Sequence, residues 1–170
     1  MLIMEKFSLN GSTYIAGLVA NNDGTNVNIF NSFNVVDIPN GTGIAGNSKG
    51  TISNCYNTGN CMYGLLGANQ GKLKSCYSIG ISFSKYILTY NIYANSYVSN
   101  CYYLEGTANS FAYSGDVSKV DSKTTFFSEG KMKQKDFVDL LNSENEEQDQ
   151  AIWKVDKDNK NGGYPILYWQ

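Results

Sequence analysis

The sequence predicts a mainly β protein: a right-handed parallel β-helix (β-solenoid) of about four to five rungs with a small C-terminal α+β cap. Three observations indicate this fold class. A short motif recurs every 21 to 25 residues, the spacing of short solenoid repeats. Glycines stand at matching distances before the motif in its two central copies. No helical periodicity occurs within the repeats.

The motif is clearest between Gly50 and Gly59, where the chain reads GTISNCYNTG. Related copies begin at Asn28, Lys72 and Tyr97. Because successive coils pair strand on strand, aligned residues should stack into ladders along the solenoid. The apolar column is Ile29, Ile52, Leu73 and Val98; the polar column is Asn31, Asn54, Ser75 and Asn100; the small column is Ser32, Cys55, Cys76 and Cys101; and the aromatic column is Phe33, Tyr56, Tyr77 and Tyr102.

Each complete repeat begins with a glycine-led apolar strand and a polar turn that ends in glycine. The two clearest cases are Gly43 to Gly50 (GIAGNSKG) and Gly64 to Gly71 (GLLGANQG). Glycines at such positions predict positive φ or close approach to the neighbouring coil. In the fourth copy Thr89 and Ser96 occupy the two glycine positions, so its turn should differ.

The last third of the chain differs in composition, because most of the charged residues of the chain follow Val117. We therefore predict a β-helix array over residues 1–117 and a cap over residues 118–170. Lys131 to Asn142 predicts one amphipathic helix, begun at Ser128. The cap should cover the last rung, since an open solenoid end exposes strand edges and core. The covering residues are expected to be Phe137, Leu140, Leu141, Trp153, Ile166, Leu167 and Trp169.

Cysteine and tyrosine are adjacent in the motif, so only one of their columns can face the core of a straight strand. We expect the cysteines inside as free, buried thiols rather than a metal or redox site, because Ser32 fills the same position. Cys61 lies in a variable segment and can be exposed. The outward aromatic column has two open interpretations. Corner packing with the hydroxyls in water is favoured, and a sugar-stacking ligand platform is the alternative.

Composition narrows the function classes. The chain has no histidine, 16% charged residues and a net charge of −2, so nucleic-acid binding is not expected. No apolar run is long enough for membrane insertion. Enzymatic activity is not predicted, because the acids of the array are far apart in the repeat scheme. These acids are Asp23, Asp37, Glu105 and Asp116.

No cofactor and no metal are predicted either. The stretch DKDNKNGG resembles a calcium loop in composition but lacks the closing glutamate, so we expect a solvated turn there. Its ligand-type residues are Asp156, Asp158, Asn159 and Asn161.

The opening MLIMEKFSLN predicts a strand over Met1 to Leu9 and a turn at Asn10-Gly11, which would form a partial first rung. Its apolar stretch is too short for a secretory signal. The chain is therefore expected to be either cytosolic or a fragment of a longer exported protein, and the fragment is favoured.

The pattern GIAGNSKGTISNCYNTG resembles the GLUG-type repeat of bacterial cell-surface and secreted proteins, including non-catalytic regions of IgA-specific metallopeptidases. The order of the later motifs is also similar: SNCYYLEGTA, then KMKQKDFVDLLN, then a tryptophan, an aspartate and NGGYPIL. The resemblance covers roughly Gly17 to Gln170. It implies a β-helix on an extracellular or cell-wall-attached protein, and it brings no catalytic residues.

We therefore expect a non-catalytic β-solenoid segment that acts as a stalk or as an adhesin, with a host glycan or a surface protein as its partner. The alternative is an accessory region of a secreted protease or glycan-active enzyme whose catalytic domain lies elsewhere in the parent chain.

Overall fold

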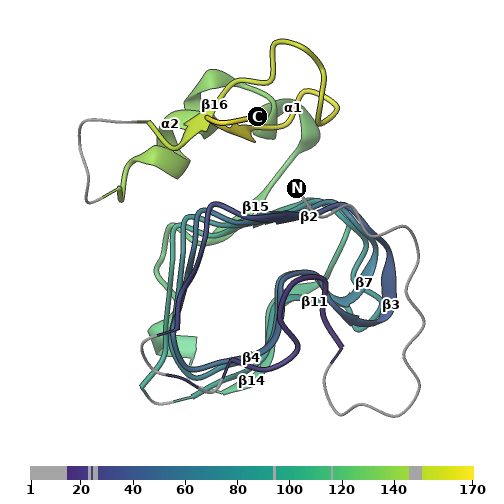
Figure 1. Cartoon of the computed structure of the whole chain (residues 1–170), viewed down its shortest axis with the longest axis vertical. Coiled ribbons are helices and arrows are strands. Elements are labelled where there is room, and N and C mark those ends of the chain that lie inside the picture. The colour runs from purple at the N-terminus through teal and green to yellow at the C-terminus, as the bar shows by residue number, and fades with distance from the viewer. Residues whose placement is uncertain (1–14, 23, 25–26, 94, 116, 146–150) are drawn as a thin grey trace.

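The computed structural model describes residues 15–170 except 23, 25–26, 94, 116 and 146–150. The predicted strand at Met1 to Leu9 and the Asn10-Gly11 turn lie outside these residues. The described chain is mainly β, with about four turns of parallel β-solenoid and two short α-helices in the C-terminal part (Figure 1). The predicted fold class is confirmed.

Three walls of parallel strands enclose the solenoid. The lysine wall, named for Lys72 and Lys74, consists of β1 (Ile29–Phe30), β5 (Thr51–Ser53), β9 (Lys72–Lys74) and β12 (Tyr97–Ser99). The tyrosine wall consists of β2 (Phe33–Asn34), β6 (Tyr56–Asn57), β10 (Tyr77–Ser78), β13 (Tyr102–Leu104) and β15 (Thr125–Phe127). The third wall consists of β4 (Ala45–Ser48), β8 (Leu66–Asn69), β11 (Tyr86–Ile92) and β14 (Ser110–Gly115). A short pair, β3 (Ile38–Thr42) and β7 (Cys61–Tyr63), adds a further corner.

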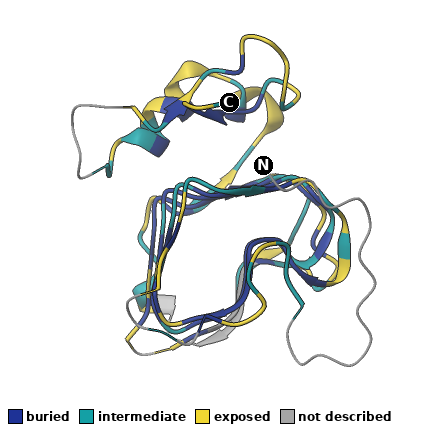
Figure 2. Cartoon of the chain, in the orientation of Figure 1, coloured by how far each residue is buried: buried dark blue, intermediate teal, exposed yellow. Residues whose placement is uncertain are grey.

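The strand register matches the columns of the sequence. Ile52 pairs with Ile29 on one side and with Leu73 on the other. Tyr77 likewise pairs with Tyr56 and Tyr102. The apolar column and the three cysteines are buried inside the coils, together with Ile44, Leu65, Leu66 and Ile87 (Figure 2). Like residues therefore stack on like in the core, as predicted.

The polar column forms the corner between the lysine and tyrosine walls. All four of its residues have positive φ: 49° at Asn31, 53° at Asn54, 48° at Ser75 and 51° at Asn100. Asparagine tolerates this left-handed conformation better than most residues with a side chain. This single residue per coil turns the chain from one wall to the next.

Glycine is needed at the repeat positions because a side chain would have no room there, and not because of an unusual φ. None of the four residues, Gly43, Gly50, Gly64 and Gly71, has positive φ. A Cβ atom on Gly43 would lie 2.0 Å from the carbonyl oxygen of Gly64, and one on Gly71 would lie 2.0 Å from that of Gly50. Close approach between coils, one of the two predicted reasons, is the reason for glycine at these positions.

The end of the array lies further along the chain than the predicted boundary after residue 117. Helix η1 (Val117–Lys119) is followed by a parallel bridge from Val120 to Val98. Strand β15 then pairs with β13 through Phe127. Residues 118–127 therefore complete a coil of the solenoid. We call the part that follows, residues 128–145 and 151–170, the tail.

The tail contains α1 (Glu129–Met132), α2 (Lys135–Asn142) and an antiparallel pair of β16 (Trp153–Lys154) and β17 (Ile166–Leu167). The predicted single helix is two helices, with Ser128 at the first N-cap as expected. The tail lies beside the tyrosine wall and not over the end of the solenoid (Figure 1). The predicted position of the cap was therefore wrong, because the tail packs on the outward tyrosines of the wall.

Replacing Gly71 by alanine should lower the free energy of unfolding by about 2 kcal/mol, because the new methyl group has no room against the Gly50 carbonyl. Gly130→Ala is the matched control, since nothing lies within 4 Å of its Cβ position. That change should be neutral or slightly stabilising. Urea unfolding measures both variants. Equal midpoints for the two would contradict the close packing of the coils.

Candidate functional site

The predicted aromatic platform is a column of rings on the outside of the tyrosine wall. Phe33 and Tyr56 have ring centroids 4.9 Å apart, and Tyr56 and Tyr77 have centroids 5.2 Å apart, with nearly parallel planes. Tyr102 continues the column and stacks on Phe127 of the last coil at 5.1 Å. The cysteines face inward and the tyrosines outward, as the alternation of the strand requires.

The tail covers this stack. Trp153 lies 5.4 Å from Tyr77, and Phe137 meets Tyr102 edge-on at 5.1 Å. Tyr56, Tyr77 and Tyr102 are at most 1% exposed. The aromatic column is therefore a second hydrophobic core between the wall and the tail, and it does not present a ligand-binding platform.

The phenol groups are also bonded inside this core. The Tyr77 hydroxyl donates to the carbonyl oxygen of Pro165 and accepts from the Asn161 side chain at 2.7 Å. The Tyr56 hydroxyl accepts from the Gln170 amide at 2.9 Å. Burial raises the pKa of Tyr56 to about 12 and that of Tyr77 well above its usual range. The favoured interpretation, with the hydroxyls in water, was also wrong. The sequence showed that the column faces out but not what covers it.

The cysteine column has a structural role. Cys55, Cys76 and Cys101 are free and buried, as predicted. Each thiol donates to the carbonyl oxygen two residues earlier, at 3.2, 3.0 and 3.1 Å respectively. Ser32 makes the same bond to Phe30 at 2.7 Å. Serine therefore replaces cysteine here because a hydroxyl satisfies the same corner carbonyl.

Cys61 is buried as well, which corrects the expectation that it can be exposed. It lies at the start of β7 and its sulfur contacts the carbonyl oxygen of Gly59 at 3.5 Å. Burial raises the pKa of this thiol to about 11.

The segment that resembles a calcium loop is built around the Asp156 carboxylate. Backbone N–H groups of Lys160, Asn161 and Gly163 donate to it at 2.9, 2.7 and 3.0 Å. Burial alone acts to raise the pKa of Asp156, but these three bonds outweigh it and hold the pKa below its ordinary value. The side chain is buried, so this turn is not simply solvated as predicted. Its carboxylate oxygens are occupied by the loop itself.

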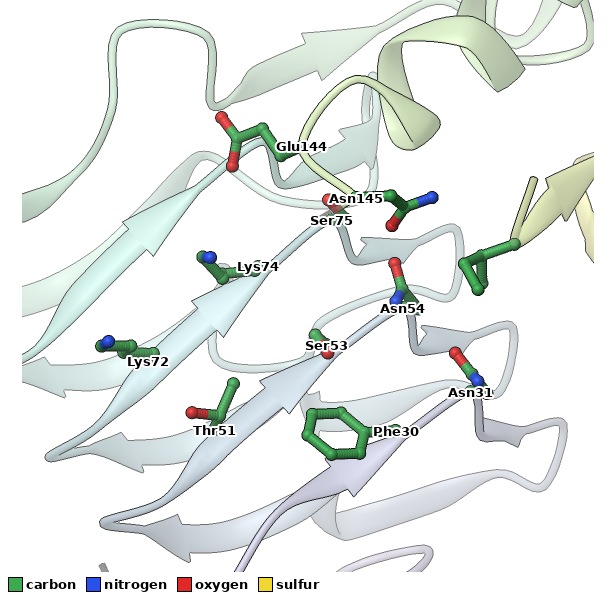
Figure 3. A pocket seen from close by; sticks show the side chains of 11 residues that line it. Phe30, Asn31, Thr51, Ser53, Asn54, Lys72, Lys74, Ser75, Glu144 and Asn145 are labelled. Carbon is green, nitrogen blue, oxygen red and sulfur yellow. The ribbon is translucent and has the colours of Figure 1, made fainter. Parts of the chain in front are cut away.

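A groove lies between the outer face of the lysine wall and the segment of the tail after α2 (Figure 3). Its volume is about 410 Å³. Thr51 and Ser53 of β5 and Lys72 and Lys74 of β9 form the floor, and Phe30 of β1 flanks it. The other lining residues are Asn31, Asn54, Ser75, Glu144, Asn145 and Ile152.

The groove brings charges of both signs together. Its floor carries the two lysines of β9. The carboxylate of Glu144 faces them from the tail, and it also lies 4.0 Å from the ammonium group of Lys123.

The sequence contained one signal for this site. In the strands TIS, KLK and YVS, one buried apolar residue stands between two outward side chains, so the lysines of β9 must share one face. The contribution of Glu144 could not be found in this way, because it depends on where the tail docks.

The four acids considered from the sequence do not form a site among the described residues. Asp37 accepts the backbone N–H of Asn60 at 2.7 Å, and Glu105 is exposed after β13. Asp23 and Asp116 lie outside the described residues. Within the described part of the chain, no three His, Cys, Asp or Glu side chains are grouped to hold a metal ion.

Comparisons with protein-family models, with curated proteins and with solved structures find no match to this chain. The class of protein is therefore defined by the fold itself, a parallel β-solenoid with a docked tail. None of the helices in the described ranges has the length and apolar character needed to cross a membrane.

The four thiols should resist labelling in the native protein. Burial holds the pKa values of Cys55, Cys61 and Cys76 above their ordinary value, so little reactive thiolate forms at pH 8. Titration with a thiol reagent should detect none of the four before unfolding and all four in denaturant. Rapid labelling of any cysteine in the folded chain would contradict their place in the core.

The docked tail should loosen in acid. Because the folded pKa of Asp156 is lowered, its stabilising effect is complete above the pKa of a free aspartate, about 3.9, and is lost as the pH falls through the folded value. The fluorescence of the two tail tryptophans, Trp153 and Trp169, followed from neutral pH downward, should report this change. Asp156→Asn should weaken the tail already at neutral pH.

Asp158→Asn is the control for this experiment, because the Asp158 side chain is exposed and pairs with Lys160 only at 3.8 Å. It should leave the acid transition unchanged. An identical effect of the two substitutions would show that the hydrogen-bonded loop does not hold the tail.

Proposed function

We propose that this chain is a non-catalytic β-solenoid segment of a bacterial cell-surface protein, extracellular or attached to the cell wall as part of a larger parent chain. Stacked coils make a rigid rod whose length grows with each repeat. This property suits a stalk that carries a surface away from the cell. The resemblance of the repeats to the GLUG type supports the location.

The open groove on the lysine wall supports a second role, as the adhesive face of that stalk. It is the observation that carries the proposal, because it joins solvent access, exposed aromatic surface and hydrogen-bonding side chains in one place. Ligand sites commonly combine apolar contact with a few placed polar groups. The partner is a host glycan or a surface protein.

The proposal predicts binding that depends on Phe30, whose side chain is 50% exposed beside the groove. The intact chain is screened against arrays of glycans and of extracellular host proteins. Phe30→Ala should lower the affinity for any ligand found by about tenfold, the size of effect expected for an aromatic contact.

Ile81→Ala is the matched control, since Ile81 is 52% exposed but follows β10 and does not line the groove. It should bind as the unchanged chain does. Binding that survives Phe30→Ala would place adhesion on another face. An absence of ligands on both arrays would remove the adhesive role and leave only the stalk.

A further inference from the structure

We propose that strand β14, at the end of the third wall, binds an extended segment of a partner protein by strand addition. The segment runs parallel to β14, is uncharged and places apolar side chains toward the core. This inference goes beyond the adhesive groove, because it concerns a different wall and a different chemistry. Three observations carry it: an open strand edge, the lack of protection on that edge, and an uncovered end of the core.

The third wall is covered at one end and open at the other. At its first strand, β4, the preceding coil adds two parallel bridges, from Val19 to Ala45 and from Asn22 to Ser48. At the other end β14 pairs with β11 alone among the described residues. An edge strand presents a row of backbone N–H and C=O groups on the side away from its neighbour. A further strand would pair with this row.

The other two walls end in ways that resist strand addition. The tyrosine wall ends in the three residues of β15, where the ammonium group of Lys131 lies 3.6 Å from the ring centroid of Phe127. The lysine wall ends in a single bridge at Val120, followed by Asp121 and Lys123. Short edges and charged side chains are common means of blocking the pairing of an edge with another chain.

Strand β14 has neither kind of protection. It is six residues long, reads SFAYSG, and contains no charged residue and no proline. The described part of the tail lies against the tyrosine wall, on the far side of the solenoid from β14 (Figure 1). Of the three edges at this end of the solenoid, β14 is therefore the one suited to accept another strand.

The core is also uncovered at this end. Phe111 of β14 meets Tyr103 edge-on at 4.9 Å, and both Phe111 and Ala112 are only partly buried where they pack on the core. In the inner coils of the same wall, Leu65 and Ile87 are fully buried. A strand that continued the wall would lay an apolar side chain over Phe111, as each inner coil does for the next.

These features select an extended polypeptide as the ligand. The edge needs donors and acceptors that repeat at the spacing of a β-strand, about 3.3 Å per residue, and a polypeptide backbone supplies them. Both the β8–β11 and the β11–β14 pairs of this wall are parallel, so a parallel strand continues the established pairing. A charged side chain turned toward the core would be buried without a partner, so the segment is uncharged.

The proposal is tested with the intact chain and fluorescently labelled peptides, by anisotropy. The first peptide is GLLGANQG, residues 64–71, because it contains β8, which pairs on both of its edges in this wall. The second peptide carries Gly67→Pro and Ala68→Pro. Adjacent N–H groups of a strand point to opposite sides, so one of these prolines removes a donor that faces β14. The third peptide is a scrambled sequence of the same composition.

We expect GLLGANQG to bind and the other two peptides to bind about tenfold more weakly, because a backbone hydrogen bond and the fit of the apolar side chains are lost. A chain that binds none of the peptides, or that binds the scrambled peptide as tightly as GLLGANQG, would overturn strand addition.

Variants of the chain locate the site. Ser110→Lys places an ammonium group at the exposed start of β14, and Ala112→Lys places one at a partly buried position of the same strand. Each should weaken binding of GLLGANQG about fivefold, because an added strand would take water away from the charge. Thr125→Lys makes the same change on the edge of β15 and should leave binding unchanged. Urea midpoints are measured in parallel; if Ala112→Lys does not fold, Ser110→Lys decides the question.

Two further outcomes would overturn the proposal. Equal losses of binding on Ser110→Lys and Thr125→Lys would show that β14 is not the site. Sedimentation of the chain alone, over a range of concentrations, tests for a second copy as the occupant. Self-association that Ser110→Lys abolishes would show that another copy of this chain takes the edge instead of a partner protein.

Discussion

The parallel pairing of each coil with the next is the constraint on which the rest of the structure depends. It places Ile29, Ile52, Leu73 and Val98 above one another, and the same register stacks the cysteines inside and the tyrosines outside. Coils can approach this closely only where glycine leaves room for the neighbouring carbonyl, as at Gly43 and Gly71. One left-handed residue per coil, at the corner between the lysine and tyrosine walls, then turns the chain without breaking the register. A change in one rung is therefore felt by the rungs on both sides.

The inward cysteine column has a consequence on the opposite side of the same strand. An outward aromatic residue in every coil produces a long apolar stripe, which water would contact if nothing covered it. The tail shields the stripe from water by packing Phe137, Trp153 and Leu167 on it. It also satisfies the phenol groups through Pro165 and Gln170. The solenoid has two cores for this reason, one inside the coils and one between the tyrosine wall and the tail, and the second exists only while the tail is docked.

The sequence predicts local geometry here much better than it predicts docking. Identical spacing was enough to assign the columns around Ile52, Cys55 and Tyr56, because stacking follows directly from the repeat. The tail residues were also recognised as a covering surface, yet they were placed over the end of the solenoid. The reason is that an exposed strand edge and an exposed aromatic stripe can both bind an apolar segment, and the sequence does not show which of the two the tail covers. The groove was missed for a related reason: Lys72 and Lys74 read as an ordinary solvated strand face until Glu144 is brought opposite them.

The tail links the tyrosine wall to the groove, because the same segment covers the tyrosine wall and forms one side of the groove. Glu144 and Asn145 follow α2 directly, and α2 is held by Phe137 and by the bond from Asn100 to Leu140. The position of the groove therefore depends on the docking of the tail. By linkage, whatever binds in the groove of the docked form also stabilises that docking, and whatever releases the tail weakens binding. The Asp156 loop and the Asn100 corner lie outside the floor of the groove, yet both hold the tail in the position that forms the groove.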